Sequence, residues 1–385
     1  MEGDRPLLLD VSRLIWRRWV GRLPTGIDRV CLAYLAHYGS QAQAVIQRRG
    51  VRRILGPKTS DRLFRLLTGS DAAFRTELVR ALVAEAFSRP GRPSLDRLYL
   101  NVGHTGLQDA GFLNWVRRSG VRPVYMVHDL IPITHPEYCR AGEAERHAAR
   151  MRTVLASAAG IIGNSQATLD ALDHFRSRQQ LAPVPMVASW LGTDVEVGSR
   201  LPDQAGPPTF VVLGTIEGRK NHLLLLQLWS RLIERLGDRT PRLLVIGQRG
   251  WESEQVFDLL DRSSSLHRSV REISRCTDGE LADYLGSARA LLFPSLVEGY
   301  GLPLVEALAA GTPVIASDLP VFREIGQGVP DFIDPLDGPA WDRAIMDYAA
   351  PDSPARAAQM TRLRSFERPT WPAHFAAVDS WLESL

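Results

Sequence analysis

The chain of 385 residues is 45% hydrophobic and 23% charged, with a formal net charge of +3, a composition that excludes a disordered or fibrous protein. Because a single core stops growing near about 250 residues, we expect two domains. Cys31, Cys139 and Cys276 lack metal-ligand spacing and are expected to be the reduced thiols of a cytoplasmic protein. No signal peptide is recognisable, and no apolar run approaches the ~20 residues of a membrane span.

The first sixty residues are strongly basic, with eleven arginines and lysines against four acids, and Trp16 and Trp19 lie among them. Such a stretch fits an anionic membrane surface or a phosphate-bearing acceptor, and a solvated basic face is the simpler alternative. No groove-reading motif accompanies the charge, so we expect no nucleic acid partner. The expected location is cytoplasmic, or peripheral on the inner face of the cytoplasmic membrane.

The first predicted strand, residues 6–11, leads through a polar connection to a helix that begins near Gly26. The backbone at this glycine could approach a ligand phosphate closely, although an ordinary helix-start turn explains it equally well. Residues 60–90 are predicted to be helical, because apolar side chains recur there at intervals of three and four.

Two further predicted strands, residues 98–102 and 123–127, are followed by His104 and His128. Ligands of open α/β sheets bind beyond the carboxyl ends of the strands, so both histidines stand where a ligand could lie. A lone histidine is more often structural than functional, and we expect a structural role for His104.

Strands and helices continue to alternate along the rest of the chain, which predicts an α/β protein with two doubly wound parallel sheets. Residues 176–206 are rich in proline, glutamine and glycine, and residues 201–208 are expected to link the two domains. The expected strands are residues 160–163, 209–213, 243–247, 290–293 and 312–316, and the expected helices include 143–158, 223–236, 278–287 and 372–385.

Residues 293–324 contain a strand, a glycine-bearing loop and a helix, so the helix N-terminus points into the loop. Free backbone N–H groups and the helix dipole make such a loop an anion site. An anion would repel Glu298 and Glu306, and these acids are therefore expected to receive hydroxyl hydrogens. Together the two features suggest a sugar nucleotide, and a surface loop with two solvated acids is the alternative.

Lys220 is one of only two lysines among 46 basic residues, and it lies between a predicted strand and a predicted helix. A compact ammonium can act as a point charge between phosphate oxygens, and Arg219 beside it could supply a second charge. Chance placement of a rare residue is the alternative. No paired acids stand at a strand end in a setting that suggests a metal-bound diphosphate, so we expect neither a metal nor another cofactor.

The segment EGYGLPLVE, followed by AGTPVIASDLP, resembles the signature of the retaining family-4 glycosyltransferases of GT-B fold. TGIDRV, VHDLIPITHPEY, GNSQAT and GTIEGRKN are similar to segments of the same family. The resemblance implies two Rossmann-like domains facing across a cleft. Residues 1–200 would form the acceptor-side domain, residues 207–365 the nucleotide-sugar-binding domain, and residues 366–385 a helix that crosses back to the first domain.

The resemblance also implies roles for individual residues. His128 would stand at the reactive face of the sugar, Glu298 would hold the sugar hydroxyls, and Glu306 would hold the ribose. Many members of the family carry an arginine where Thr215 stands and a proline where Gly218 stands, so the phosphate loop departs from the usual pattern. The residues implied in donor binding are Gly26, Thr215, Arg219, Lys220, Gly299, Tyr300, Gly301, Leu302 and Glu306.

The function implied is retaining, metal-independent transfer of a hexosyl unit from a nucleotide sugar to a lipid-linked oligosaccharide or polysaccharide. The motif combination looks most like mannosyltransferases of bacterial polysaccharide assembly, which makes GDP-mannose the leading donor. A UDP-hexose or dTDP-rhamnose donor remains an alternative. So do a non-catalytic GT-B scaffold and a nucleotide-sugar epimerase of the same fold.

Overall fold

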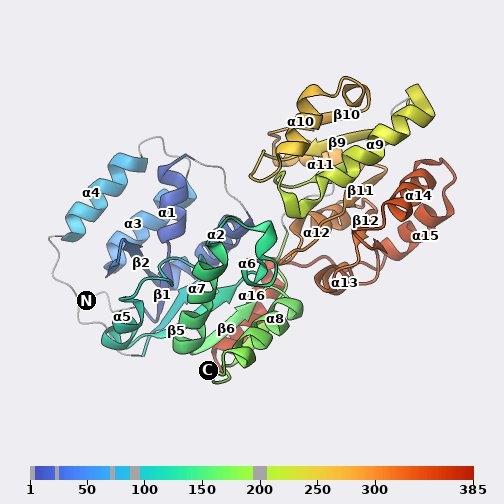
Figure 1. Cartoon of the computed structure of the whole chain (residues 1–385). Helices are drawn as coiled ribbons and strands as arrows, with labels where there is room; N and C mark the ends of the chain where they lie inside the picture. Colours follow the sequence, from blue (N-terminus) through green and yellow to red (C-terminus); the bar gives the residue numbers. More distant parts are fainter. Residues whose placement is uncertain (1–4, 22–25, 70–73, 87–95, 194–205) are drawn as a thin grey trace. The chain divides into compact units, whose positions relative to one another are not determined.

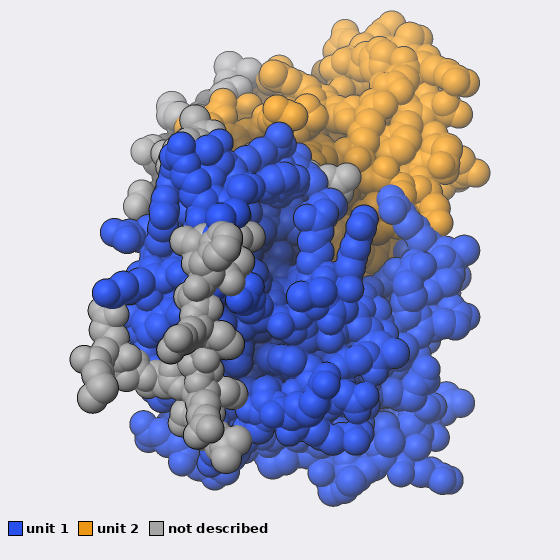
Figure 2. Space-filling model, turned by 90° about the vertical axis from the view of Figure 1, so that its left-hand side faces the viewer, with its two compact units in different colours: residues 1–191, 371–385 blue, residues 192–370 orange. Residues whose placement is uncertain are grey.

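The computed structural model describes residues 5–21, 26–69, 74–86, 96–193 and 206–385. The chain divides into two compact units, shown in separate colours in Figure 2. Unit 1 comprises residues 1–191 and 371–385, and unit 2 comprises residues 192–370. The division falls at 191/192 and 370/371, whereas the sequence suggested a first domain that ends at residue 200, a second at residues 207–365 and a C-terminal helix from residue 366. The linker expected at residues 201–208 lies mostly outside the described residues.

The strands of unit 1, of which Figure 1 labels β1, β2, β5 and β6, pair in the order β3-β2-β1-β4-β5-β6-β7, and all neighbours are parallel except β2 and β3. Strands such as β1 and β6 are buried along their whole length, as expected when helices cover both faces of a parallel sheet. The bounds are β1 Leu7–Asp10, β2 Ala42–Arg48, β3 Val51–Ile54, β4 Leu98–Asn101, β5 Arg122–Val127, β6 Gly160–Gly163 and β7 Met186–Ala188.

The helices of unit 1 pack on this sheet through a core that includes Tyr99, Phe112 and Tyr125. Residues 60–90, predicted to be one helical stretch, contain most of α3 and all of α4, and Gly69 follows the end of α3. The helices are α1 Ser12–Trp19, α2 Gly26–Tyr38, α3 Pro57–Thr68, α4 Phe74–Ala86, α5 Phe112–Ser119, α6 Ile131–Thr134, α7 Glu143–Ser157, α8 Gln166–Arg178 and α16 Trp371–Leu382.

The C-terminal helix α16 belongs to unit 1, although the intervening residues form unit 2. It packs on α2, where the hydroxyl of Tyr34 lies 2.9 Å from Nε2 of His374 and the hydroxyl of Tyr38 donates to Asp379 at 2.6 Å. Phe375 stacks on the ring of His37 at a centroid distance of 3.9 Å. These contacts hold the C-terminal helix α16 on unit 1.

Unit 2 contains a parallel sheet in the order β10-β9-β8-β11-β12-β13, which is the 3-2-1-4-5-6 order of a Rossmann fold. Trp229, Trp341 and Phe210 lie in its core with no exposed surface. Its strands are β8 Thr209–Leu213, β9 Arg242–Ile246, β10 Val270–Ile273, β11 Ala290–Phe293, β12 Val314–Ser317 and β13 Asp331–Ile333. Its helices are α9 His222–Leu236, α10 Glu254–Arg262, α11 Asp278–Ser287, α12 Leu302–Ala309, α13 Pro320–Gly326, α14 Gly338–Ala349 and α15 Pro354–Leu363.

Each sheet has a topological switch point, where the strand order reverses. It lies between β1 and β4 in unit 1, and between β8 and β11 in unit 2. The loops that leave these strands at their carboxyl ends diverge, which opens a crevice in which ligands bind. Among the described residues, no helix is both long and apolar enough to cross a bilayer.

Candidate active site

The loop after β8 carries the lysine and arginine that the sequence analysis selected. A short 3-10 turn, Gly218–Lys220, ends at Asn221, whose left-handed backbone (φ 56°) starts α9. Lys220 is buried, with 7% of the residue exposed. Gly247, which directly follows β9, lets the loop after β8 pass close to its backbone, because a Cβ on Gly247 would lie 2.0 Å from the carbonyl oxygen of Gly214.

The loop after β11 carries Glu298 and ends at Gly301, the N-cap of α12. Gly301 has a φ of +112°, and a Cβ on it would lie 2.7 Å from the ring of Phe322, so a glycine is required. Leu302 is the first residue of α12. Pro303 has no N–H, and the N–H of Leu304 bonds the carbonyl oxygen of Gly301 at 2.9 Å, so within this first turn the N–H of Leu302 is the donor that could serve an anion.

The two loops meet in a buried ion cluster of Arg219, Lys220 and Glu298. Nη1 of Arg219 lies 2.7 Å from Oε2 of Glu298, and the ammonium of Lys220 donates to Oε1. The side chain of Glu298 is only 6% exposed. The sequence assigned the two cations and the carboxylate to different parts of a donor, and the structure shows that they also bind one another.

Other residues of these loops, to which the sequence analysis gave no role, complete the cluster. The hydroxyl of Ser295 donates to Oε1 of Glu298 at 2.9 Å, and Glu217 pairs with Nη2 of Arg219 at 2.6 Å. The ammonium of Lys220 lies 5.0 Å from the ring centroid of Phe293, a distance suited to a cation–π contact. Glu217 stands two residues before Arg219 in GTIEGRKN, and this spacing was the available signal for the Glu217–Arg219 pair.

The electrostatics of the cluster keep Glu298 ionised. Burial alone would raise its pKa, but the charges of Arg219 and Lys220 outweigh burial and lower the pKa to about 2. Burial lowers the pKa of Lys220 and raises that of Glu217, each against the effect of its ion partners. The carboxylate of Glu298 is therefore a fixed negative charge at neutral pH, held between two cationic side chains.

His222, the first residue of α9, is another polar residue of this region that the sequence analysis did not select. It is 2% exposed, and neither ring nitrogen has a hydrogen-bond partner within the part of the chain that the structure describes. Burial, with a smaller contribution from the charge of Lys220, lowers its pKa to about 3, so the ring is neutral.

The remaining residues predicted for unit 2 lie on the same loops. Thr215 directly follows Gly214 at the end of β8, and its side chain is half-buried. Gly299 and Tyr300 precede the N-cap of α12, and Tyr300 is 5% exposed. Glu306 lies on α12 and is 3% exposed. The β8/β11 switch point thus brings together the two loops and the helix α12 that carry the residues predicted for unit 2.

The residues predicted for unit 1 lie in the loop after β5 and at the start of α2. His128 follows β5 and is buried, with Nε2 2.7 Å from the carbonyl oxygen of Val102. Burial lowers the pKa of His128, so the ring is neutral near pH 7. Gly26 is the first residue of α2 and is exposed. Its predicted contact with a donor phosphate stays a prediction.

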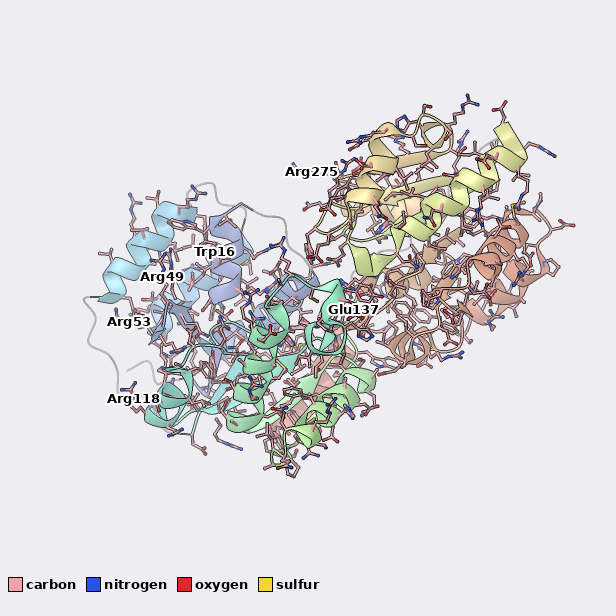
Figure 3. All side chains as sticks on the ribbon, in the orientation of Figure 1. Trp16, Arg49, Arg53, Arg118, Glu137 and Arg275 are labelled. Atoms are coloured by element: carbon pink, nitrogen blue, oxygen red, sulfur yellow. The ribbon has the colours of Figure 1, made fainter. Side chains whose placement is uncertain are left out.

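Unit 1 also contains a cavity of 840 Å³ that is lined by His128. Trp16 of α1 and Arg53 of β3, both among its lining residues, lie in the same part of unit 1 (Figure 3). Because the loops after β1 and β4 contribute to the wall, the cavity lies at the carboxyl ends of the strands. This is the position at which an open α/β sheet binds its ligand.

Two solved structures resemble this chain over nearly its whole length. HepE of Anabaena in complex with UDP-glucose has a TM-score of 0.66 at 14% identity, covering 98% of this chain and 99% of that one. Sucrose-phosphate synthase from Thermosynechococcus elongatus has a TM-score of 0.63 at 18% identity, covering 99% of both chains. Together with the two Rossmann-like units, these likenesses define a protein of the GT-B fold class, as the sequence predicted.

Within this fold class, residues 199–327 match the family described as "Glycosyl transferases group 1". The serotype-specific mannosyltransferase WbdA of Escherichia coli is 30% identical over 231 residues, which are 55% of this chain and 28% of that protein. The O-antigen chain mannosyltransferase RfbU of Salmonella typhimurium is 38% identical over 101 residues, covering 26% of this chain and 27% of RfbU. The match to WbdA thus spans little more than a quarter of that relative's length.

Proposed function

We propose that the chain transfers a mannosyl unit from GDP-mannose to a lipid-linked saccharide, with retention of the anomeric configuration and without a metal ion. The observation that carries this proposal is the cluster of Arg219, Lys220 and Glu298 at the switch point of unit 2, whose residues 199–327 match glycosyl transferases group 1. It supplies two cations for a diphosphate and one carboxylate for sugar hydroxyls on adjoining loops.

The cluster can accept a diphosphate without giving up its ion pairs. An ammonium has three N–H donors, and Lys220 uses one of them on Glu298, which leaves capacity for phosphate oxygens. The N-terminus of α12 adds the N–H of Leu302 on the neighbouring loop. Positive charge fixed beside the departing diphosphate stabilises the charge that develops as the glycosidic bond breaks.

Glu298 retains room for a sugar hydroxyl. A carboxylate offers about four lone-pair sites, and Arg219, Lys220 and Ser295 occupy three of those on Glu298. One site is left to accept a hydrogen bond from a donor hydroxyl, and the lowered pKa keeps it available at neutral pH. Glu306 would hold the ribose hydroxyls, and His128 would bond a hydroxyl at the reactive face of the sugar.

The sugar and acceptor are inferred from the relatives and from the surface of unit 1. WbdA and RfbU are named as mannosyltransferases, and RfbU as an O-antigen chain enzyme, which favours a mannosyl donor and a saccharide acceptor. Trp16 is 56% exposed on α1, whose last turn carries Arg17 and Arg18. An exposed tryptophan beside arginines suits the interface of an anionic membrane, where a lipid-linked acceptor would be held.

A donor screen tests this proposal. GDP-mannose should raise the melting temperature of the full chain more than UDP-glucose or dTDP-rhamnose at equal concentration, because a ligand that binds only the folded state stabilises it. Incubation of the preferred donor without acceptor should release at most a little free sugar. Conversion of the donor to an epimeric nucleotide sugar would contradict transfer, and so would the absence of both binding and turnover with all three donors.

A further inference from the structure

The cavity of unit 1 has an apolar rim and a polar interior. Trp16, Val51 and Val79 line it and are 56%, 71% and 48% exposed, which places them at its open side. His128 and His147 also line it and are 6% and 5% exposed, which places them in its interior. A ligand that fills this cavity therefore has one polar end and one apolar end.

His104, His128 and His147 form a cluster in the interior of the cavity. The ring of His104 lies 5.2 Å from that of His128 and 6.0 Å from that of His147, measured between centroids. The three come from different elements: the loop after β4, the loop after β5 and helix α7. Because residues far apart in sequence converge on one cavity, the cluster is a product of the tertiary fold.

The hydrogen bonds of these rings determine which nitrogen carries the proton. Nε2 of His104 lies 2.7 Å from the carbonyl oxygen of Met126, and Nε2 of His128 lies 2.7 Å from that of Val102. Nε2 of His147 lies 3.1 Å from the carbonyl oxygen of Asp129. A carbonyl oxygen can only accept, so each Nε2 carries a hydrogen. Burial lowers the pKa of each ring, so all three are neutral and each Nδ1 keeps its lone pair.

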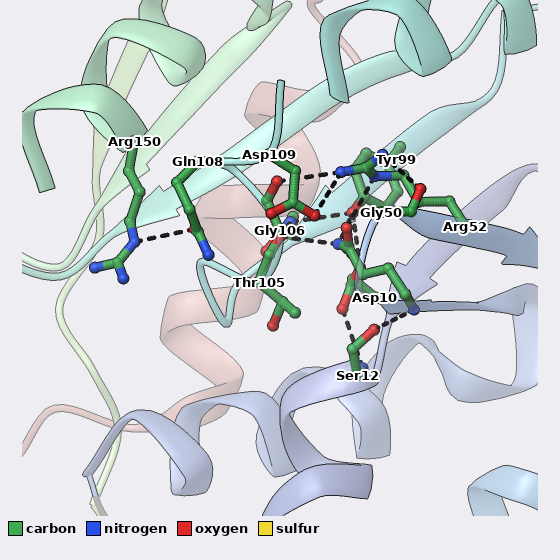
Figure 4. Close-up of polar contacts among 12 residues, drawn as sticks. Asp10, Ser12, Gly50, Arg52, Tyr99, Thr105, Gly106, Gln108, Asp109 and Arg150 are labelled. Atoms are coloured by element: carbon green, nitrogen blue, oxygen red, sulfur yellow. Dashed lines mark hydrogen bonds and ion pairs between the residues drawn. The ribbon is translucent and has the colours of Figure 1, made fainter. Parts of the chain in front are cut away.

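The loop that carries His104 is held by a partly buried polar network (Figure 4). Nε2 of Gln47 donates to Oδ2 of Asp10 at 2.5 Å and to the carbonyl oxygen of Thr105 at 2.8 Å. Arg52 donates to the carbonyl oxygen of Gly106 at 3.3 Å. His104 itself has a left-handed backbone (φ 57°), a conformation that surrounding contacts must hold in place.

We propose that His104 and His147 bind hydroxyl groups of the acceptor saccharide through their Nδ1 atoms, with the apolar rim receiving a hydrophobic aglycone. The proposal rests on the transferase function proposed above and specifies the acceptor end of that reaction. A neutral ring with a free lone pair accepts a hydrogen from a hydroxyl and offers nothing to a phosphate oxygen. The site is therefore expected to select an uncharged, hydroxyl-rich head group.

Two arginines in the wall of the cavity are paired with carboxylates. Arg13 bonds the carboxylate of Asp28 at 2.7 Å, and Arg150 bonds that of Glu143 at 2.8 Å. Each carboxylate also pairs with a second arginine, Arg17 or Arg146, so the wall keeps positive charge. The preference for saccharide hydroxyls therefore rests on the neutral histidines of the interior.

Decyl α-D-mannoside, used below its micellar concentration, is the probe for this site. Its affinity for the full chain should fall about fivefold in His104→Gln and in His147→Gln, the effect of losing one neutral hydrogen bond. Glutamine keeps an N–H donor near the position of Nε2 and lacks the Nδ1 lone pair. The matched control is His267→Gln, because His267 also lies 2.8 Å from a backbone carbonyl oxygen through Nε2, in unit 2.

The permethylated decyl mannoside provides a second measurement, because it keeps the oxygens and loses every hydroxyl donor. It should bind the wild-type chain more weakly, and the substitutions at His104 and His147 should leave its affinity unchanged. Equal affinities of both glycosides, equal affinities of the variants and wild type, or no binding of decyl mannoside by the wild type would overturn the proposal. Since no nucleotide sugar is present, loss of the proposed transferase activity is scored separately by the donor screen.

Discussion

Lys220 and Glu298, 78 positions apart in the chain, are joined by a buried hydrogen-bonded ion pair between the loops that follow β8 and β11. The pair places a cation and a carboxylate at the switch point of a Rossmann-like sheet, where ligands bind. Arg219 and Ser295 bond the same carboxylate, which fixes its orientation. We attribute donor binding to this cluster.

Replacing Lys220 by alanine should weaken donor binding by about 10- to 100-fold, because a charge-assisted hydrogen bond contributes about 1.5–3 kcal/mol. Lys58 is the other lysine of the chain and is exposed, so Lys58→Ala is the matched control and should leave donor affinity unchanged. Isothermal titration with GDP-mannose measures both variants. Equal donor affinity in Lys220→Ala and Lys58→Ala would refute the role assigned to Lys220.

Glu298→Gln should reduce the transfer rate by at least about tenfold, because the neutral amide loses one lone-pair acceptor and the negative charge that faces the sugar. Glu280 is a suitable control, since it is exposed in the capping box of α11 within the same unit. Steady-state rates with GDP-mannose and decyl mannoside give the comparison. If the Glu298→Gln and Glu280→Gln variants transfer mannose at the same rate, Glu298 has no role in the mechanism.

The stability of the protein should depend on Glu298 in acid. Its pKa is lowered from 4.5 in the unfolded chain to about 2 in the folded chain, so its contribution is complete above pH 4.5 and falls as the pH approaches 2. Urea unfolding of the wild type and Glu298→Gln between pH 6 and pH 3 measures this contribution. The difference between the two proteins should shrink below pH 4.5, and a difference that stays constant would contradict the ion pair.

Gly301→Ala should lower stability by about 1–3 kcal/mol, because its backbone has a φ of +112° and the new methyl group would lie 2.7 Å from the ring of Phe322. Gly279 of α11 provides the control, since a Cβ there would meet no atom within 4 Å. Gly279→Ala should leave stability unchanged or raise it. The melting temperatures of the two variants test this prediction. Equal melting temperatures would show that the loop before α12 accommodates the methyl group.

Transfer should continue in the presence of EDTA, because two cationic side chains and a helix N-terminus are available for the leaving diphosphate. The measurement is the initial rate with and without EDTA. Activity that is abolished by EDTA and restored by magnesium or manganese would contradict metal independence.

Much of the fold could be predicted from the sequence, because its signals are local. The strand-and-helix alternation of both units follows from short apolar runs between amphipathic segments, and the loops at β8 and β11 carry recognisable motifs. The antiparallel edge strand β3 was not predicted, because its residues VRRI carry no continuous apolar run and none of them is fully buried. The spacing of apolar residues also did not predict that residues 60–90 form separate helices.

The internal arrangement of the sites could not be predicted, because it depends on contacts between distant residues. Nothing in the sequence around Glu298 shows that Lys220 and Arg219 bond its carboxylate. His104 was expected to be structural, and its Nε2 does bond a backbone carbonyl, but its ring also lines the cavity with His128 and His147. Those convergences appear only when the loops and α7 are assembled on the sheet.

The most direct test of the central claim is to identify the product formed from GDP-α-D-mannose and decyl α-D-mannoside by NMR of its anomeric protons. The account predicts release of GDP and formation of an α-linked dimannoside, with the rate lost in Lys220→Ala and retained in Lys58→Ala. A β-linked product, or a rate that is equal in the two variants, would contradict it.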